Sequence, residues 1–366
     1  MIRVETVSTP QVAVKNIVRD LDQGHLPLEE ENRLLETLEF YECWSPLLRT
    51  LSRRLSDTSR RGVVDYIHLA RIQNRRLEDS AAAARTAALL VEQMEMDYES
   101  FRQEAVPLIV AEDDFGTESL ILEAISQVLP PRAGKVACLE RLCLIYEKKK
   151  YNERMLNESY KRLILADSQN IKALRFFKVV YTQNNEWDEV AKILRTLHTS
   201  VRHEGDKYRY AQELATVYLY QLDRPKRAIE VIEKYCSKSH LDTSTIHFEA
   251  YSRLGNWEGC LNVLKECLTK VDGAVPKAVL HYKIGELEAQ LGKVVEAATN
   301  FHLSLNLDPQ FLEPFESLIE LSLNGKKWHE AVALLAQLQT KVGSPELRLR
   351  IEEAKLRLQD GIASVG

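Results

Sequence analysis

Three tryptophans recur in one local context and give the sequence a period. Trp187, Trp257 and Trp328 each follow a short polar or glycine-containing break and precede an apolar run. The intervals between them are 70 and 71 residues, about two units of 35, and Pro225 and Val294 occupy the midpoints. Steps of about 36 residues back from Trp187 reach Tyr151, Phe115, Ser80 and Trp44. About nine units of roughly 35 residues are therefore present, and such a period is typical of a helical solenoid.

The apolar residues on both sides of each break follow a helical spacing. In the unit around Val294 they are Leu280, Ile284, Leu287 and Leu291 before the break, and Ala297, Phe301 and Leu305 after it. A short connection makes the two segments antiparallel helices, and because neither can bury its apolar stripe alone, each pair must stack on the next. The composition agrees, because 14 Gly and 11 Pro in 366 residues are too few for a turn-dense all-β fold. We expect an all-α protein.

The segment from Ala278 to Pro309 resembles a tetratricopeptide repeat. The residues that carry the resemblance are Gly285, Gly292, Ala297, Phe301, Leu305, Asp308 and Pro309. Small residues at Gly285 and Ala297 let two helices approach closely, and Pro309 cannot continue the preceding helix. The resemblance implies a right-handed α–α superhelix, or solenoid, of about nine helical hairpins with a C-terminal capping helix.

The repeat pattern divides the chain into four parts. They are an N-terminal segment with a short helix (1–28), about three divergent helical hairpins (29–131), about six tetratricopeptide-like repeats (132–342), and a capping helix with a tail (343–366). The divergent hairpins could also belong to another α-hairpin fold, and Pro107 should kink or end the helix that contains it. In the capping helix we expect Ser344 as the N-cap, Pro345 in the first turn and Gly361 as the stop.

Two rare residue types are expected to serve packing. The tryptophans are interpreted as wedges between the two helices of their own hairpin rather than as ligand-binding residues. The six cysteines lie within apolar helical patterns and are expected to be small buried side chains, not a disulfide framework. Cys236, His240 and His247 could be grouped as metal ligands, but ordinary roles at helix ends account for them better. We expect no metal and no cofactor.

Composition and motifs exclude several function classes. The sequence contains no dinucleotide-binding, phosphate-loop, zinc-protease or serine-hydrolase signature, so we do not expect an enzyme. No apolar stretch approaches the length of a membrane span, and no signal-peptide pattern opens the chain, so membrane insertion is not expected and we predict a cytoplasmic protein. The formal charge of −5 gives no overall attraction to nucleic acid.

Tetratricopeptide arrays bind an extended peptide or a helix in a concave groove lined by the first helix of each repeat. Carried over to this sequence, the groove positions are Lys172, Arg175, Val179, Arg209, Gln212, Glu249, Tyr282, Glu286, Glu313, Glu316 and Glu320. The predicted groove is basic in its middle and acidic toward its C-terminal end. The alternative is that these side chains are simply solvated charges.

Charge is also segregated along the N-terminal third. The stretch from Arg49 to Arg76 is strongly basic, and the stretch from Glu92 to Glu123 is strongly acidic. Neighbouring units of opposite sign could attract one another along the stack. Alternatively, the arginines form a basic docking patch suited to carboxylates or phosphates, for which the candidates are Arg53, Arg54, Arg71 and Arg75.

The resemblance and the missing catalytic motifs together favour a non-catalytic scaffold or adaptor that binds a partner protein or peptide in the groove. One alternative is a regulatory tetratricopeptide module of a signalling or motility system, which docks a small GTPase or a response regulator. Another is an RNA-processing helical repeat protein, although the basic stretch has few interleaved aromatic residues and nucleic-acid binding is not favoured. Self-association through the end surfaces of the array is also open.

Overall fold

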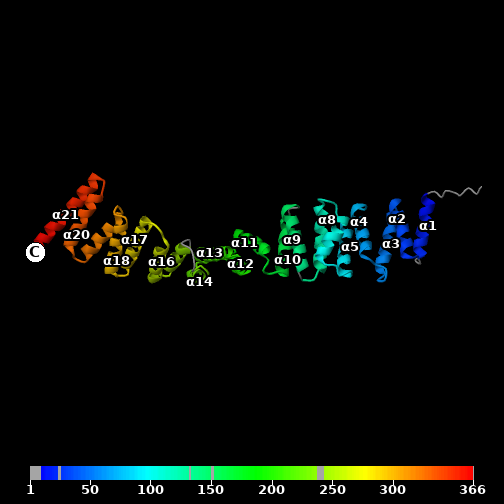
Figure 1. Cartoon of the computed structure of the whole chain (residues 1–366), viewed down its shortest axis with the longest axis horizontal. Helices are drawn as coiled ribbons and strands as arrows, with labels where there is room; N and C mark the ends of the chain where they lie inside the picture. Colours follow the sequence, from blue (N-terminus) through cyan, green and yellow to red (C-terminus); the bar gives the residue numbers. More distant parts are fainter. Residues whose placement is uncertain (1–9, 24–25, 132, 150–151, 237–242, 366) are drawn as a thin grey trace, which may run out of the picture. The chain divides into compact units, whose positions relative to one another are not determined.

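The computed structural model describes residues 10–23, 26–131, 133–149, 152–236 and 243–365. These residues form helices and connecting turns with no strand among them, which confirms the predicted all-α class. The chain divides into two compact units, Met1–Ala173 and Leu174–Gly366, and the boundary falls inside helix α11 (Figure 1).

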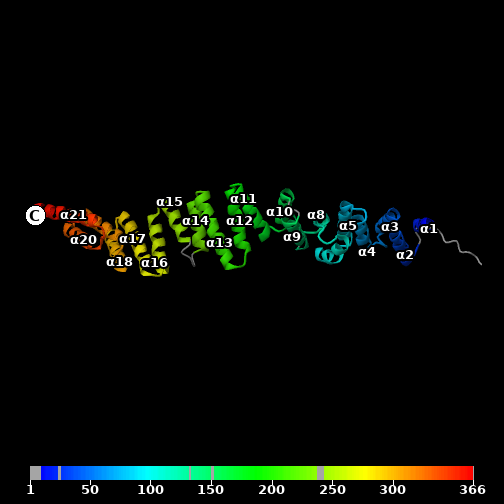
Figure 2. The same cartoon turned by 90° about the horizontal axis from the view of Figure 1, so that it is seen from above.

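The first unit is a row of helical hairpins, each made of an A helix and the antiparallel B helix that follows it (Figure 2). Helix α1 (Pro10–Gln23) precedes the first hairpin. In chain order the helices are α2 (Leu28–Phe40) with α3 (Trp44–Ser56), α4 (Val63–Arg75) with α5 (Ser80–Gln93), an interrupted A helix with α8 (Phe115–Val128), and α9 (Ala133–Lys148) with α10 (Glu153–Ala166). The interrupted A helix consists of α6 (Tyr98–Ser100), the π-helical turn η1 (Phe101–Ala105) and α7 (Val106–Ile109).

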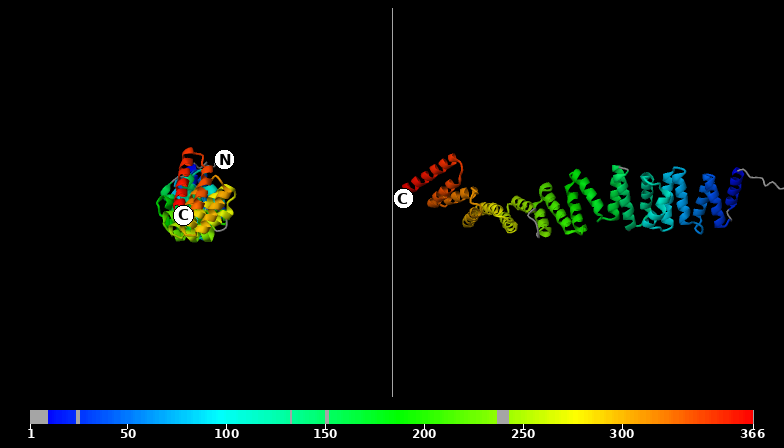
Figure 3. Two further views of the ribbon diagram at one scale, coloured as in Figure 1. Left: turned by 90° about the vertical axis from the view of Figure 1, so that its left-hand side faces the viewer. Right: turned by 45° about the horizontal axis from the view of Figure 1, so that its top comes forward.

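The second unit continues the same plan (Figure 3). Its hairpins are α11 (Ile171–Gln183) with α12 (Trp187–Ser200), α13 (Glu204–Thr216) and the π-helical turn η2 (Val217–Gln221) with α14 (Pro225–Tyr235), α15 (Ser244–Arg253) with α16 (Trp257–Lys270), α17 (Ala274–Gln290) with α18 (Val294–Leu307), and α19 (Glu313–Asn324) with α20 (Trp328–Lys341). Helix α21 (Pro345–Val365) packs against α20 as the predicted capping helix. The described residues thus contain nine hairpins, as the period predicts.

Each hairpin buries its apolar faces against the next one. In the first unit, one core cluster runs through α1 to α4 and contains Leu21, Leu35, Leu38, Leu47, Leu51, Leu69 and Ile72. In the second unit, another cluster runs through α18 to α20 and contains Ala297, Phe301, Phe315, Leu318, Leu334, Leu338 and Val342. The divergent N-terminal hairpins therefore stack in the same way as those that resemble tetratricopeptide repeats.

The two helices of one hairpin approach closely at the predicted glycine, Gly285. A Cβ atom built on Gly285 of α17 would lie only 2.6 Å from Cε1 of Phe301 in α18. Phe301 is 1% exposed and Ala297, one turn earlier on α18, is fully buried. The small residue is required because the ring of Phe301 occupies the space that a side chain at position 285 would need.

The hairpin turns share one backbone feature that sets the register of the repeats. In eight turns of the described chain, the residue two positions before the B helix has a positive φ: Glu42, Glu78, Asp113, Asn185, Asp223, Gly255, Gly292 and Lys326. The next N–H commonly donates to the carbonyl five residues earlier, as from Asn256 to Tyr251 (2.9 Å) and from Lys327 to Ser322 (2.8 Å). This bond satisfies a carbonyl at the end of the A helix.

The first residues of the B helices confirm the predicted register. Eight positions of the sequence period each begin a B helix: Trp44, Ser80, Phe115, Trp187, Pro225, Trp257, Val294 and Trp328. The ninth position, Tyr151, lies outside the described residues. The left-handed turn residue is a glycine at only two of the eight turns, Gly255 and Gly292.

Replacing Lys326 with glycine is expected to stabilise the last hairpin by about 0.5–1 kcal/mol. Lys326 has a φ of 55°, and the left-handed conformation costs a residue with a Cβ about 1–2 kcal/mol, whereas glycine loses about 0.5–1 kcal/mol in chain entropy. Amide hydrogen exchange in α19 and α20 should become slower. Gln337→Gly, at an exposed position within α20, should act in the opposite direction, and faster exchange in Lys326→Gly would contradict the argument.

The tryptophans stand at the first position of their B helices and are only partly inserted. Trp257 and Trp328 are 41% and 39% exposed, and Trp44 and Trp187 are half-buried. The prediction that they are wedges between the two helices therefore holds only in part. A first-turn side chain lies at the end of the hairpin, so the space between the helices is filled by residues such as Phe301 further along.

Two local predictions concern helix interruptions. The helix that contains Pro107 is interrupted by the π-helical turn η1 and ends at Ile109, as expected for an internal proline. The predicted stop at Gly361 is wrong, because α21 continues through this residue to Val365. A glycine lowers helix propensity by only about 1 kcal/mol, and without a following turn it does not end a helix.

The cysteines are packing residues. All six are free thiols, and five of them, all except Cys43, are buried. Burial raises the pKa of the Cys138 and Cys143 thiols to about 12 and that of Cys236 to about 11. Thiols with such pKa values remain protonated at neutral pH and are poor nucleophiles.

Candidate protein-interaction surfaces

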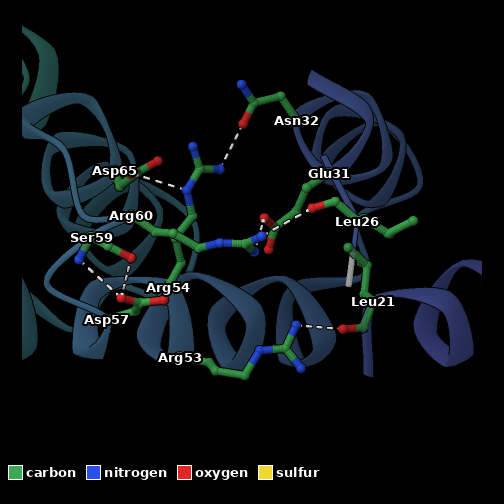
Figure 4. Close-up of polar contacts among 10 residues, drawn as sticks. All are labelled: Leu21, Leu26, Glu31, Asn32, Arg53, Arg54, Asp57, Ser59, Arg60 and Asp65. Atoms are coloured by element: carbon green, nitrogen blue, oxygen red, sulfur yellow. Dashed lines mark hydrogen bonds and ion pairs between the residues drawn. The ribbon is translucent and has the colours of Figure 1, made fainter. Parts of the chain in front are cut away.

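Two of the predicted docking arginines hold the ends of neighbouring helices in the first unit. The Arg53 guanidinium donates to the carbonyl of Leu21 near the end of α1 (Figure 4). Arg75 donates to the carbonyls of Pro107 (3.0 Å) and Val110 (2.9 Å) at the end of α7. The last carbonyls of a helix have no partner within it and carry partial negative charge. These arginines therefore act as caps supplied by another hairpin.

Arg54 forms a buried ion pair. Its Nε atom lies 3.2 Å from Oδ2 of Asp65, and the two side chains are 8% and 11% exposed. A second guanidinium nitrogen donates to Oδ1 of Asn32 at 2.6 Å, which links α3 to both α2 and α4 (Figure 4). Burial raises the pKa of Asp65, although the charge of Arg54 opposes the shift.

Two further arginines of the basic stretch, Arg60 and Arg71, also contact the preceding hairpin. Arg60 donates to the carbonyl of Leu26 (3.1 Å) and pairs with Glu31 (3.3 Å), whose side chain is 4% exposed (Figure 4). Arg71 pairs with Glu39 at 2.9 Å. Among the described residues, the basic stretch forms no ion pair with the acidic stretch, so its charges are compensated by α2, α4 and helix ends instead. A partner at Arg53, Arg54, Arg71 or Arg75 would meet side chains that are already engaged.

In the second unit, the A helices are joined by polar contacts between successive repeats. Arg175 of α11 donates to the Tyr210 hydroxyl of α13 at 2.9 Å, and Lys178 pairs with Glu213 at 2.8 Å. Arg209 pairs with Asp206 at 2.7 Å, and its guanidinium also lies over the ring of Tyr210, at 5.3 Å from the centroid. The structure thus brings Arg175 and Arg209, both predicted groove residues, to the same tyrosine.

The next A helix continues this pattern around Glu249. Glu249 accepts from Arg253 at 3.0 Å. Arg253 also donates to the carbonyl of Leu219 (3.0 Å) and pairs with Asp223 (3.1 Å) in the preceding hairpin. The charge of Glu249 is therefore compensated, and Arg253 is the residue that links α15 to the repeat before it.

The last A helix, α19, differs because its acidic side chains form no ion pair with the described residues, whereas Glu286 of the preceding A helix, α17, pairs with Lys283 at 3.0 Å. Tyr282 of α17 donates to Glu286 at 2.9 Å and meets the ring of Phe311 edge-on at 5.2 Å between centroids. Burial and this hydrogen bond raise the pKa of the Tyr282 hydroxyl. Three glutamates of α19 are exposed and form no ion pair with the described residues: Glu313, Glu316 and Glu320. We call Tyr282, Glu286, Phe311 and these three glutamates the acidic A face.

The other predicted groove residues are placed as follows. Lys172 lies in the first unit and pairs with Glu140 at 2.6 Å. Gln212 is half-buried, and its backbone carbonyl accepts from the Thr216 hydroxyl at 2.9 Å. Val179 is 50% exposed. The assignment of these residues to a binding groove remains a prediction.

Sequence reasoning missed the contacts between repeats, although their signal was present in the period. The partners are separated by 32–36 residues, which is one repeat: Arg53 and Leu21, Arg71 and Glu39, Arg162 and Ser126, Arg175 and Tyr210, Arg224 and Asp188, Arg253 and Leu219, Lys293 and Glu258. We call these contacts the repeat-to-repeat links. Opposite charges at one-repeat spacing could have been paired from the sequence.

The described part of the chain offers neither a metal site nor a membrane-spanning helix. No group of three or more His, Cys, Asp or Glu side chains there is arranged to hold a metal ion. His240, one member of the grouping considered from the sequence, lies outside the described residues. None of the described helices combines the length and the apolar character that crossing a membrane requires.

Comparison with known proteins finds similarity in structure only. No protein-family model and no curated protein matches the chain in sequence. Among solved structures, yeast Tom70 is similar over 97% of this chain and 93% of its own chain, at 11% identity and a TM-score of 0.32. The MamA protein is similar over 48% of this chain and 92% of its own chain, at 14% identity and a TM-score of 0.33. In the match with a tetratricopeptide repeat protein from Parabacteroides merdae, the aligned region covers 76% of this chain and 99% of that protein, at 14% identity and a TM-score of 0.29.

The chain's own geometry defines its fold type. Its hairpins follow a period of about 35 residues, as in helical repeat arrays. In eight hairpin turns, the residue two positions before the B helix has a left-handed conformation. The contact between Gly285 and Phe301 joins the two helices at the positions that carried the resemblance. The protein is an all-α helical-repeat solenoid whose hairpins resemble tetratricopeptide repeats.

Proposed function

We propose that the protein is a non-catalytic scaffold that binds a basic segment of a partner protein on the acidic A face. The observation that carries this proposal is the run of uncompensated glutamates on α19. On the other A helices of the second unit, several charges are matched by a neighbouring repeat, as in Lys178 with Glu213 and Arg253 with Asp223, or within the same helix, as in Arg209 with Asp206. A surface that leaves three exposed carboxylates unmatched is suited to receive lysine or arginine side chains.

The aromatic pair beside the glutamates supports the same assignment. Tyr282 lies on α17 and Phe311 lies just before α19, and both are half-buried, so they offer apolar surface next to the carboxylates. Aromatic side chains at the centre of an interface supply much of its affinity, whereas exposed ion pairs contribute about 0–1 kcal/mol each and mainly set the rate and specificity of association. The partner segment should therefore combine basic residues with at least one apolar side chain.

The test is affinity capture from a cell extract, quantified by mass spectrometry, with the double variant Glu316→Lys/Glu320→Lys. Basic partners of the original chain should be recovered at least about tenfold less well, because like charges repel across the contact. The matched control is Glu296→Lys/Glu330→Lys, which makes the same charge change at exposed positions on the B helices α18 and α20. Equal recovery with both double variants would overturn the assignment to the acidic A face.

A further inference from the structure

A second surface, in the first unit, is basic, in contrast to the acidic A face. Its cations have no carboxylate partner among the described residues. A pocket of about 400 Å³ lies among the ends of the B helices α8 and α10 and the first turn of the A helix α9. Its lining includes Ser126, Pro131, Lys135, Arg162, Leu165 and Ala166, and no carboxylate of the described residues lines it. We call it the basic pocket.

The two cations of the basic pocket are bonded only to neutral groups. Arg162 is half-buried and donates to the hydroxyl oxygen of Ser126. Lys135 is also half-buried and donates to the carbonyl of Leu129 at 3.3 Å. Neither cation forms an ion pair with any residue that the structure describes. By contrast, the half-buried or buried cations Arg54, Arg60 and Lys178 each have a carboxylate.

The hydrogen-bonding capacity of Arg162 is largely unused. The Ser126 hydroxyl is fully buried and donates its own hydrogen to the carbonyl of Glu123 at 2.8 Å, so it offers Arg162 a lone pair only. The carboxylate of Glu123 is engaged elsewhere, because it accepts from the Tyr146 hydroxyl. A guanidinium has five N–H donors in a planar arrangement that matches the two oxygens of a carboxylate. The side chain is thus held in place by Ser126 with donors left for an oxyanion.

An apolar surface adjoins these cations. Leu165 is 85% exposed, more than any other large apolar side chain in the described residues. Pro131 and Ala166 lie beside it in the lining of the pocket. A ligand that fills the pocket therefore needs a negative group at Arg162 and Lys135 and an apolar group next to it.

We propose that the basic pocket binds a carboxylate side chain of an acidic peptide segment, with a neighbouring apolar side chain of that segment on Leu165. The volume accommodates one or two residues of a chain, and the lining offers one polar and one apolar half. This site is independent of the proposed function on the acidic A face, since it lies in the other unit and selects the opposite charge. A chain with both sites can hold an acidic segment and a basic segment at once.

The experiment follows the methyl resonances of Leu165 by NMR in the full chain, with the probe peptide acetyl-Leu-Glu-Leu-amide. A saturable shift of these resonances is expected. Acetyl-Leu-Gln-Leu-amide, which keeps the shape but lacks the charge, should bind at least about fivefold more weakly. In the variant Lys135→Gln/Arg162→Gln the dissociation constant for the Glu peptide should rise at least about tenfold.

A matched variant separates the pocket from general charge. Arg154→Gln/Lys161→Gln removes two exposed cations from the same helix α10, outside the basic pocket, and should bind the Glu peptide as the original chain does. Three results would overturn the proposal: no saturable shift at millimolar peptide, equal affinity for the two peptides, or equal loss in both double variants. Inorganic phosphate that binds as tightly as the Glu peptide would also overturn it, because the pocket would then be a site for small oxyanions.

Discussion

The variant Arg54→Met should lose about 3–5 kcal/mol of stability in the first two hairpins, because it leaves the carboxylate of Asp65 buried without a cation. The two side chains are 8% and 11% exposed, so solvent cannot replace the lost partner. The bond from Arg54 to Asn32 of α2 is lost as well. Hydrogen exchange measured by mass spectrometry should show faster exchange in α2, α3 and α4, and unchanged exchange in the second unit, because repeat arrays couple only neighbouring units.

A second substitution tests the cause. In Arg54→Met/Asp65→Leu the buried charge is gone. Most of the lost protection against hydrogen exchange in α2, α3 and α4 should return, because replacement of a buried ion pair by apolar residues often leaves the stability unchanged. If the double variant exchanges as fast as the single one, the loss comes from packing around Arg54 and not from the orphaned carboxylate.

The deficit of Arg54→Met should also depend on pH. Burial raises the pKa of Asp65, and removal of the nearby cation removes the effect that opposes this shift. A carboxyl whose pKa is higher in the folded than in the unfolded state favours folding as it takes up a proton. The difference between variant and original chain should therefore be largest above the folded-state pKa, and smaller at about pH 5 than at about pH 8. A difference that grows at acidic pH would contradict this account.

The variant Gly285→Val should destabilise the hairpin of α17 and α18 by about 3 kcal/mol through overpacking. The added Cβ would meet Cε1 of Phe301 at 2.6 Å and Cδ1 at 2.8 Å, and the ring has no room to withdraw because it is 1% exposed. Valine has a better helix propensity than glycine, but this gain is below about 1 kcal/mol and does not offset the clash. Amides of α17 and α18 should lose about a hundredfold in protection.

Gly259 supplies the matched control for this prediction. A Cβ there would lie 2.5 Å from Cδ1 of Tyr251, an equally short approach. Tyr251, however, is only half-buried and can turn toward solvent, so Gly259→Val should cost clearly less than Gly285→Val. In Gly285→Val/Phe301→Leu, the combined loss should be smaller than the sum of the two single losses, because the smaller side chain makes room. Additive losses would show that the Phe301 ring is not the obstacle.

The sequence predicted the architecture well because the architecture is periodic. Trp187, Trp257 and Trp328 revealed the interval, and each marks the start of a B helix in the structure. The register also extends to the divergent units around Ser80 and Phe115, where the glycines are missing. There the backbone requirement is for a left-handed residue, and Glu78 and Asp113 meet it at some cost in energy.

The surfaces were harder to predict, because a charge in a sequence does not show its partner. Arg54 was grouped with the docking arginines and is buried against Asp65, and Arg175 was assigned to the groove and bonds to Tyr210. Arg162 was not singled out from the sequence, yet Arg162 and Lys135 line one pocket as half-buried cations that have no carboxylate partner among the described residues. Only the fold shows which charges cancel and which are left over.

The repeat-to-repeat links have a consequence for how such a chain can change in length. Each link joins positions one repeat apart, such as Lys293 with Glu258 or Arg224 with Asp188, and no link depends on a third unit. Duplication or loss of one complete repeat would therefore create or remove a set of links without disturbing the others. A protein with this fold can therefore be lengthened by duplication of the gene segment that encodes one repeat. The duplicated repeats can then diverge in which of their charged side chains have no partner.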